Sequence, residues 1–236
     1  MTLRTIKTIL RRLGNPRTAK LLQGFFKTGP GEYGEGDIFL GIKVPVLRKL
    51  AGEARDADFG IISALLKSPI HEERLLALLL LVQRYSAGSE HDKQRTFQLY
   101  LNNTRYINNW DLVDLTAPRI VGAHLAGRNR RILHAMAKSS SLWERRIAIL
   151  STFYFIGQGE FSDSLKIART LLHDKEDLIH KAVGWMLREI GKRNLSREES
   201  FLRIHCRTMP RTTLRYAIER FPEAKRRRYL NGTVAI

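Results

Sequence analysis

Hydrophobic and polar residues follow one another along this chain with the spacing of α-helices. Apolar side chains recur at intervals of three and four residues, and the two-residue alternation of β-strands is scarce. One glycine-rich stretch, Thr28–Gly36, is predicted to be a loop. The pattern predicts an all-α protein whose helices cover residues 2–13, 16–27, 44–54, 57–67, 70–86, 91–101, 109–126, 129–138, 141–157, 161–173, 176–193, 197–206 and 210–220.

Four of the predicted helices resemble one another at a fixed interval. The segments that begin at Glu73, Asn109, Glu144 and His180 align with offsets of 36, 35 and 36 residues. A period of this length, filled by two antiparallel helices, is typical of an α-solenoid. Identity between the units is weak, which indicates HEAT-like repeats that form a curved superhelix. We therefore predict a single repeat domain over residues 1–236.

The repeat register gives two positions a particular meaning. Trp110 stands where the other units have cations, and Asp114 stands where they have large apolar residues. If these helices line one side of the stack, the cations follow one concave surface that can track a duplex backbone. The cations at the first position are Arg74, Arg145 and Lys181, and the residues at the second are Leu78, Ile149 and Trp185.

The chain is strongly basic, with 41 Lys and Arg against 23 Asp and Glu and a net charge of +18. Residues 119–236 hold 24 basic and 11 acidic residues, whereas residues 1–118 hold 17 and 12. This balance favours nucleic acid as the partner over a generally basic soluble protein. The last residues, 221–236, read as a flexible basic tail that either binds the nucleic-acid backbone or is simply solvated.

Several function classes are excluded or disfavoured. Cys206 is the only cysteine, which excludes an internal disulfide and a multi-cysteine metal site and fits a reducing compartment. A membrane-spanning helix needs an apolar run of about 18 residues, and no run in this sequence is that long. The apolar stretch Leu75–Val82 is predicted to be part of a buried helix. His71, His124 and His173 lack metal-ligand spacing and are expected to be caps or surface residues. We expect a cytoplasmic protein with no metal, cofactor or membrane partner.

Trp110 and Asp114 form the candidate site that the residues themselves suggest. Helical spacing places side chains four residues apart on one face. An indole beside a carboxylate, on so basic a protein, is suited to a polyanion that carries a cationic centre. The alternative is structural, because a tryptophan on an amphipathic helix is most often a core residue and Asp111 can be a helix cap.

Four short blocks of the chain occur in the order and spacing of a known family: Phe39–Pro45, Asn109–Asp114, Leu142–Leu150 and Lys175–Glu189. Together they resemble the bacterial AlkD-like DNA glycosylases of the DNA alkylation repair family. The resemblance implies a HEAT-like solenoid that wraps duplex DNA as a monomer near the bacterial nucleoid. It implies hydrolysis of the N-glycosidic bond of N3- and N7-alkylated purines, such as 3-methyladenine and 7-methylguanine, without base flipping and without a cofactor.

The resemblance also assigns roles to residues of this chain. The family's catalytic aspartate falls on Asp114, its sugar-contacting tryptophans on Trp110 and Trp185, and its DNA-contacting arginine on Arg146. A family tyrosine falls on Phe25 or Phe26, which lack the hydroxyl. The repeat register and helix faces add further candidate backbone contacts at Arg74, Arg145, Lys181 and Arg188; of the last two, one is expected to face a phosphate and the other to form a salt bridge near Glu189.

The chemistry of an alkylated purine explains why these residue types suit it. The base carries a positive charge and is already a good leaving group, so the enzyme has to stabilise the oxocarbenium-like sugar. The Asp114 carboxylate can do this and can orient or deprotonate the attacking water. The ring faces of Trp110 and Trp185 attract a developing cation, and Arg146 can hold a flanking phosphate.

Two other functions fit the same composition. A non-catalytic helical-repeat scaffold can bind DNA or structured RNA by shape and charge, but it has no use for Asp114. A protein–protein adaptor is common among solenoids, and it predicts a mixed or acidic concave surface.

Overall fold

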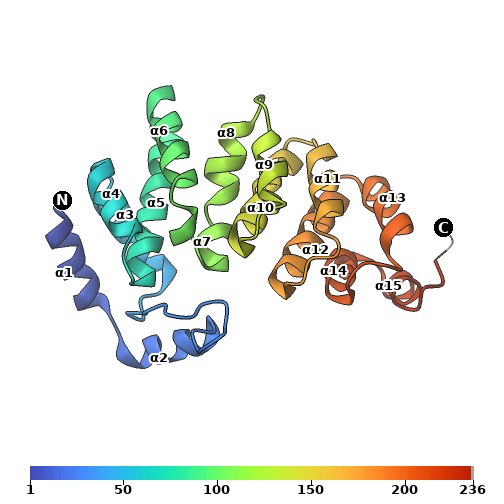
Figure 1. The fold of residues 1–236 in the computed structure, drawn as a ribbon, viewed down its shortest axis with the longest axis horizontal. Helices are drawn as coiled ribbons and strands as arrows, with labels where there is room; N and C mark the ends of the chain where they lie inside the picture. Colours follow the sequence, from blue (N-terminus) through green and yellow to red (C-terminus); the bar gives the residue numbers. More distant parts are fainter. Residues whose placement is uncertain (235–236) are drawn as a thin grey trace. The chain divides into compact units, whose positions relative to one another are not determined.

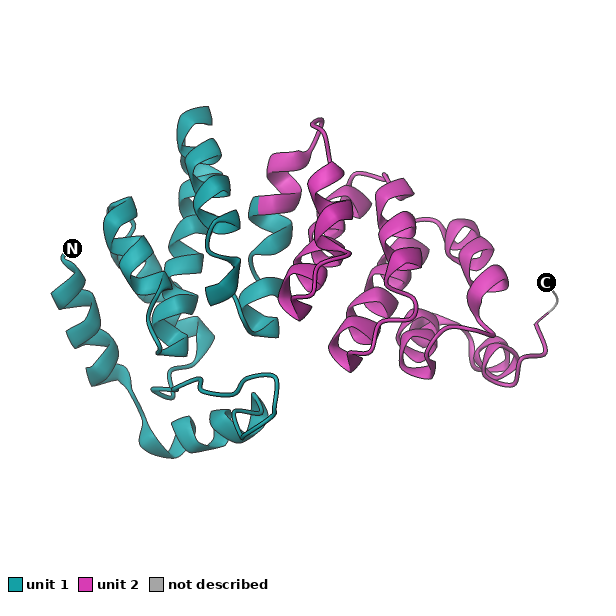
Figure 2. Ribbon diagram, in the orientation of Figure 1, with its two compact units in different colours: residues 1–120 teal, residues 121–236 magenta. Residues whose placement is uncertain are grey.

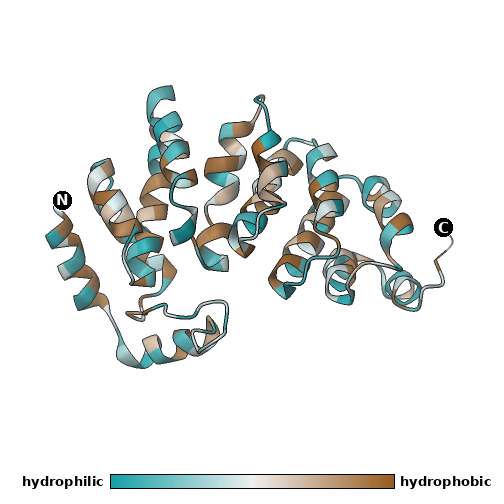
Figure 3. Ribbon diagram, viewed as in Figure 1, coloured by the Kyte–Doolittle hydropathy of each residue, from teal (hydrophilic) through white to brown (hydrophobic). Residues whose placement is uncertain are grey.

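The computed structural model describes residues 1–234 as helices joined by connections, of which the one between residues 26 and 43 is the longest (Figure 1). The β pairing found in this range is an isolated bridge between Ile38 and Ile70. The all-α prediction is confirmed. The chain divides into two compact units, Met1–Ile120 and Val121–Ile236 (Figure 2), and hydrophobic residues recur along the helices of both (Figure 3).

Unit 1 is built around its longest helix, α5, which packs against α3, α4, α6 and α7. The predicted buried helix is confirmed, because the side chains of residues 75–81 are all buried. Removal of this much apolar surface from water is the main stabilising contribution to the unit. Its elements are α1 (Leu3–Leu13), α2 (Pro16–Phe25), α3 (Val44–Glu53), α4 (Phe59–Leu66), α5 (His71–Ala87), α6 (Glu90–Leu101), the 3-10 turn η1 (Thr104–Tyr106) and α7 (Trp110–Asp114).

Unit 2 is a second stack, in which α12 packs against α10, α11, α13 and α14. Stacked helix pairs within each unit are the arrangement of an α-solenoid, as the repeat period predicted. Within the segment predicted as a basic tail, residues 223–230 form a helix whose Tyr229 is buried and contacts Phe221, and residues 235–236 lie outside the described residues. The elements are α8 (Ala123–Leu125), α9 (Arg131–Met136), α10 (Leu142–Gly157), α11 (Ser162–Thr170), α12 (Asp177–Gly191), α13 (Leu195–His205), α14 (Arg211–Ala217), the 3-10 turn η3 (Ile218–Arg220) and α15 (Glu223–Leu230).

The helix predicted over residues 109–126 is the main departure. The α-helical part ends at Asp114, and a π-helical turn, η2, covers Pro118–Gly122 before α8. Proline has no N–H to donate and its ring clashes with the carbonyl four residues earlier. The break therefore follows from Pro118, and it confines Trp110 and Asp114 to a helix of little more than one turn.

Helix α2 contains no buried residue, and backbone contacts hold its start. The Asn15 N–H donates to the Leu40 carbonyl oxygen at 2.8 Å. Gly41 has a φ of +83°, and a Cβ there would lie 2.2 Å from the Asn15 oxygen and 2.6 Å from the Ala19 nitrogen. Only glycine allows the chain to pass so close to the start of α2.

Gly41→Ala should therefore destabilise the protein. The strained φ alone costs about 1–3 kcal/mol, and the overlap with the backbone of α2 adds to it. Gly24→Ala is the matched control, because a Cβ on Gly24 meets nothing within 4 Å and alanine favours a helix by about 0.5–1 kcal/mol. Urea denaturation of both variants measures the difference; equal free energies of unfolding would contradict the close approach.

Candidate active site

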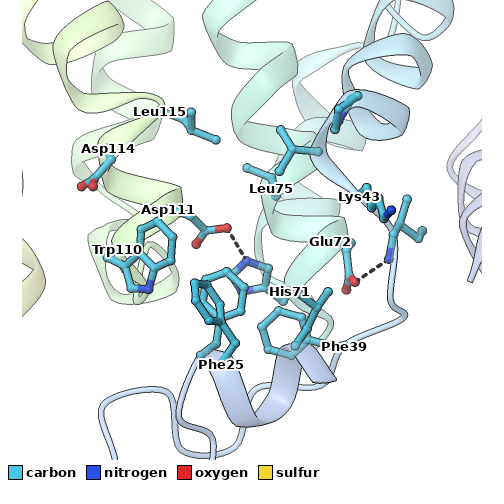
Figure 4. Close-up of a pocket in the computed structure, with 15 residues that line it drawn as sticks. Phe25, Phe39, Lys43, His71, Glu72, Leu75, Trp110, Asp111, Asp114 and Leu115 are labelled. Atoms are coloured by element: carbon cyan, nitrogen blue, oxygen red, sulfur yellow. Dashed lines mark hydrogen bonds and ion pairs between the residues drawn. The ribbon is translucent and has the colours of Figure 1, made fainter. Parts of the chain in front are cut away.

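Helix α7 carries Trp110 and Asp114 on one side and Asp111 on another (Figure 4). The helix begins at Trp110 because the Asn109 side chain accepts a hydrogen bond from the Trp110 N–H at 2.8 Å. Asn109 itself is fully buried and donates to Asp37 at 3.4 Å. The cap thus fixes where the helix starts and which side chains share a face.

Trp110 and Asp114 border a cavity of about 430 Å³ within unit 1. Both residues are half-buried. The Asp111 side chain points toward His71, whereas the Asp114 carboxylate lies on the Trp110 side of the helix (Figure 4). The lining of the cavity is mainly apolar and comes from α2, the following loop, α3, α5 and the end of α7: Leu22, Phe25, Phe26, Phe39, Leu75 and Leu115 are among its members.

A row of stacked rings supports Trp110 from inside the protein. Phe26 stacks on Trp110, with centroids 5.1 Å apart and planes at 19°. Phe26 also stacks on Phe39 at 5.0 Å, and Phe39 stacks on His71 at 4.4 Å. The sequence left Phe25 and Phe26 as alternatives. The structure separates them, because Phe26 is buried in this row and Phe25 is 64% exposed, edge-on to Trp110.

A buried charge cluster lies at the far end of the row. His71 is 2% exposed, and its Nδ1 and Nε2 atoms lie 3.1 Å from Asp37 and 2.9 Å from Asp111. Arg74 donates to Asp37 at 2.6 Å and to the Ser68 carbonyl at 3.0 Å. Burial opposes ionisation of Asp37, but its bonds to His71 and the charge of Arg74 leave its pKa below the ordinary value. His71 is thus neither a cap nor a surface residue, and that prediction was wrong; His124 is buried as well.

Glu72 anchors the loop that carries the first family-like block. Its buried carboxylate accepts hydrogen bonds from the backbone N–H groups of Leu40, Gly41 and Ile42 at 2.9, 2.7 and 3.1 Å. Charge-assisted bonds of this kind are stronger than neutral ones. Glu72 therefore ties the loop before α3 to α5, next to the aromatic row.

Most of the cations predicted to contact DNA interact with other groups of the protein itself. Arg74 is 3% exposed and belongs to the buried cluster, which is at odds with a phosphate contact and assigns it a structural role. Arg145 makes two bonds to Asp174, at 2.6 and 3.1 Å. Lys181 is partly exposed and pairs with Asp177 at 2.7 Å, and Arg188 pairs with Glu219 rather than near Glu189. Phosphate contacts by the last three stay predictions.

Trp185 and Arg146 belong to unit 2. Trp185 is half-buried beside Phe153, and its indole N–H donates to Glu189 at 3.2 Å. Arg146 is 4% exposed and donates to the Leu178 carbonyl oxygen, so its burial is at odds with a phosphate contact, as it is for Arg74. Trp110 and Asp114 belong to unit 1, so joint action of the four residues stays a prediction.

A sequence profile described as DNA alkylation repair enzyme matches residues 6–221. The chain belongs to this family. A solved structure titled "Predicted DNA alkylation repair enzyme from Enterococcus faecalis" is similar to it, with 19% identity, a TM-score of 0.68, and coverage of 89% of this chain and 97% of that chain. At this identity the likeness shows the shared helical fold. No curated protein matches the chain.

Membership of the DNA alkylation repair family supports a repair enzyme with DNA as its partner. Over residues 1–234, no helix has the length and apolar character needed to span a membrane. In the same range, no group of three or more His, Cys, Asp or Glu side chains is arranged to hold a metal ion.

Proposed function

We propose that this protein hydrolyses the N-glycosidic bond of N3- and N7-alkylated purines in duplex DNA. The observation that carries the proposal is the placement of a half-buried carboxylate, Asp114, and a half-buried indole, Trp110, on one side of a short helix at the rim of an apolar cavity. Membership of the DNA alkylation repair family supports alkylated DNA as the substrate. The site supplies groups that stabilise a cation.

The reaction needs a negative charge close to the sugar as the bond to the cationic base stretches. Asp114 supplies that charge and can orient the attacking water. Trp110 presents a ring face, and the stacked Phe26 keeps that ring in place. The neighbouring apolar side chains lower the local dielectric, which strengthens the attraction between the carboxylate and the developing cation.

The proposed reaction leaves the damaged base in the DNA stack. A flipped cationic purine needs polar partners once it is removed from water. The lining of the cavity beside Trp110 is mainly apolar and offers few such partners. The site therefore suits approach to the sugar from outside the stack better than capture of a base.

Exposed cations beside the cavity suit the DNA backbone. Lys43 borders the cavity itself, and Arg17, Lys20 and Lys27 are exposed on α2 and the loop after it. Together with the net charge of +18, these side chains favour a salt-sensitive hold on phosphates. They replace Arg74 as the candidate phosphate contacts of unit 1.

The choice of leaving group tests the proposal. We expect release of 7-methylguanine from a methylated duplex, and release of uracil at least about 100-fold slower, because uracil requires an acid to assist its departure and Trp110 and Asp114 supply none. Single-turnover assays with equal concentrations of the two duplexes measure both rates, with an unmethylated duplex as the control. Equally fast excision of uracil would overturn the mechanism.

A further inference from the structure

The rings and charges behind Trp110 form a closed circuit of contacts. The circuit runs from Trp110 through Phe26 and Phe39 to His71, with centroid distances of 5.1, 5.0 and 4.4 Å. It returns to α7 through the 2.9 Å contact between His71 Nε2 and Asp111. Because Asp111 follows Trp110 directly, both ends of the circuit hold the first turn of the same short helix. We call this circuit the α7 clamp.

The protonation state of His71 follows from its partners. Both ring nitrogens face carboxylate oxygens, Asp37 at 3.1 Å and Asp111 at 2.9 Å. An ionised carboxylate can only accept, and a neutral imidazole has only one N–H to donate. The doubly protonated imidazolium is the form that satisfies both contacts. With Arg74 it balances the two carboxylates, so that two cations meet two anions.

The electrostatics agree with this geometry. Burial lowers the pKa of His71, but its bonds to Asp111 and Asp37 outweigh that effect and the charge of Arg74, and raise the pKa to about 9. A raised pKa means that the charged form is held below about pH 9 and is lost as the pH rises through that value. The clamp is therefore intact at neutral pH.

We propose that His71 is a positioning residue of this enzyme, whose imidazolium ties Asp111 of α7 to Asp37 of the loop before α3 and thereby fixes Trp110 and Asp114 at the cavity. The proposal rests on the proposed function for its catalytic consequence. Its structural part, the charged imidazolium and the position of Trp110, can be observed without any reaction.

Few charged groups face the imidazole. They are Asp37 from the loop, Asp111 from α7 and Arg74 from α5. Glu72 follows His71 on α5, but its carboxylate is bound to backbone N–H groups of the loop. The other neighbours, Phe26 and Phe39, are uncharged. Asp111 is therefore the group whose change most directly weakens the imidazolium.

Asp111→Asn is the test. The amide keeps the size of the side chain but removes the negative charge, so the pKa of His71 should fall and the clamp should open at a lower pH. We expect the single-turnover release of 7-methylguanine to decline near pH 9 in the unchanged protein and at least one pH unit lower in D111N, with duplex affinity changed less than about twofold. Asp56→Asn, an exposed aspartate of the same unit, is the matched control and should follow the unchanged protein. Enzyme-free duplex gives the spontaneous release at each pH.

A second measurement reads the clamp directly. In the unchanged protein at pH 7, nitrogen NMR should show both His71 ring nitrogens protonated. In D111N, the Trp110 indole resonance should shift and the Trp143 indole resonance should not. The W110F variant assigns the Trp110 resonance. A singly protonated His71, or the same pH profile in D111N as in the unchanged protein, would overturn the proposal. If no methylated base is released, the glycosylase proposal fails on its own. The NMR signals of the His71 ring and the Trp110 indole then test the structural part of the proposal. A doubly protonated His71 ring and a shifted Trp110 indole support it, and their absence refutes it.

Discussion

Asp114→Asn should reduce the release of 7-methylguanine from methylated duplex by about 10²–10³-fold, the usual cost of removing one preorganised electrostatic group from a reacting centre. The amide matches the carboxylate in shape but has no charge to stabilise the sugar cation. Binding of the duplex should be retained, since in protein–DNA complexes the contacts of lysines and arginines with phosphates supply much of the affinity. Single-turnover release at saturating enzyme, with a fluorescence titration of the same duplex, separates the rate from the affinity.

The matched control for this experiment is Asp56→Asn, which removes an exposed carboxylate of unit 1 away from the cavity. It lowers the total negative charge by the same amount and should leave the release rate unchanged. Equal rates for the unchanged protein and D114N would remove Asp114 from the mechanism. Duplex binding without any release in either protein would favour the non-catalytic scaffold.

Asp37→Ala should lower the free energy of unfolding by about 3–5 kcal/mol, because it leaves buried cations without their counter-charge. Asp37 receives Arg74 at 2.6 Å and His71 at 3.1 Å, and all three side chains are buried. Exposed aspartates have no such effect, so Asp56→Ala is the control. Urea denaturation at pH 7 measures both variants; a loss below about 1 kcal/mol, typical of a surface pair, would contradict the buried cluster.

The pH dependence of this stability has a defined sign. The pKa of Asp37 is lowered in the folded protein, so its contribution is present above its ordinary pKa of 3.8 and is lost as the pH falls through the folded value. The pKa of His71 is raised from 6.5 to about 9, so its contribution is full below pH 6.5 and is lost as the pH rises through about 9. The cluster therefore stabilises the protein most between about pH 3.8 and pH 6.5.

The sequence predicts the long helices well because their apolar positions repeat over several turns. It misses two features that depend on single residues. Pro118 ends the α-helical run after Asp114 and introduces the π-helical turn, although the surrounding pattern is continuous. Helix α15 is almost entirely polar, and its buried side chain, Tyr229, is a single position that periodicity cannot register.

Sequence reasoning likewise finds one part of the candidate site and misses another. Trp110 and Asp114 are four residues apart on one helix, so local spacing is enough to bring them together. Asp37, His71 and Asp111 are separated by 34 and 40 residues, and no local pattern joins a histidine at a helix start to two distant aspartates. Arg74 shows the opposite error, because a shared repeat position suggested a surface role for a side chain that the fold buries.

The exposure of Phe25 has a consequence for how such an enzyme diverges. Its neighbour Phe26 is enclosed by other rings, and a change there would disturb several of them at once. Phe25 touches the rim of the cavity from a helix with no buried residues of its own. A substitution at position 25 can therefore alter the rim of the cavity while disturbing the packing of the fold less than a substitution at position 26.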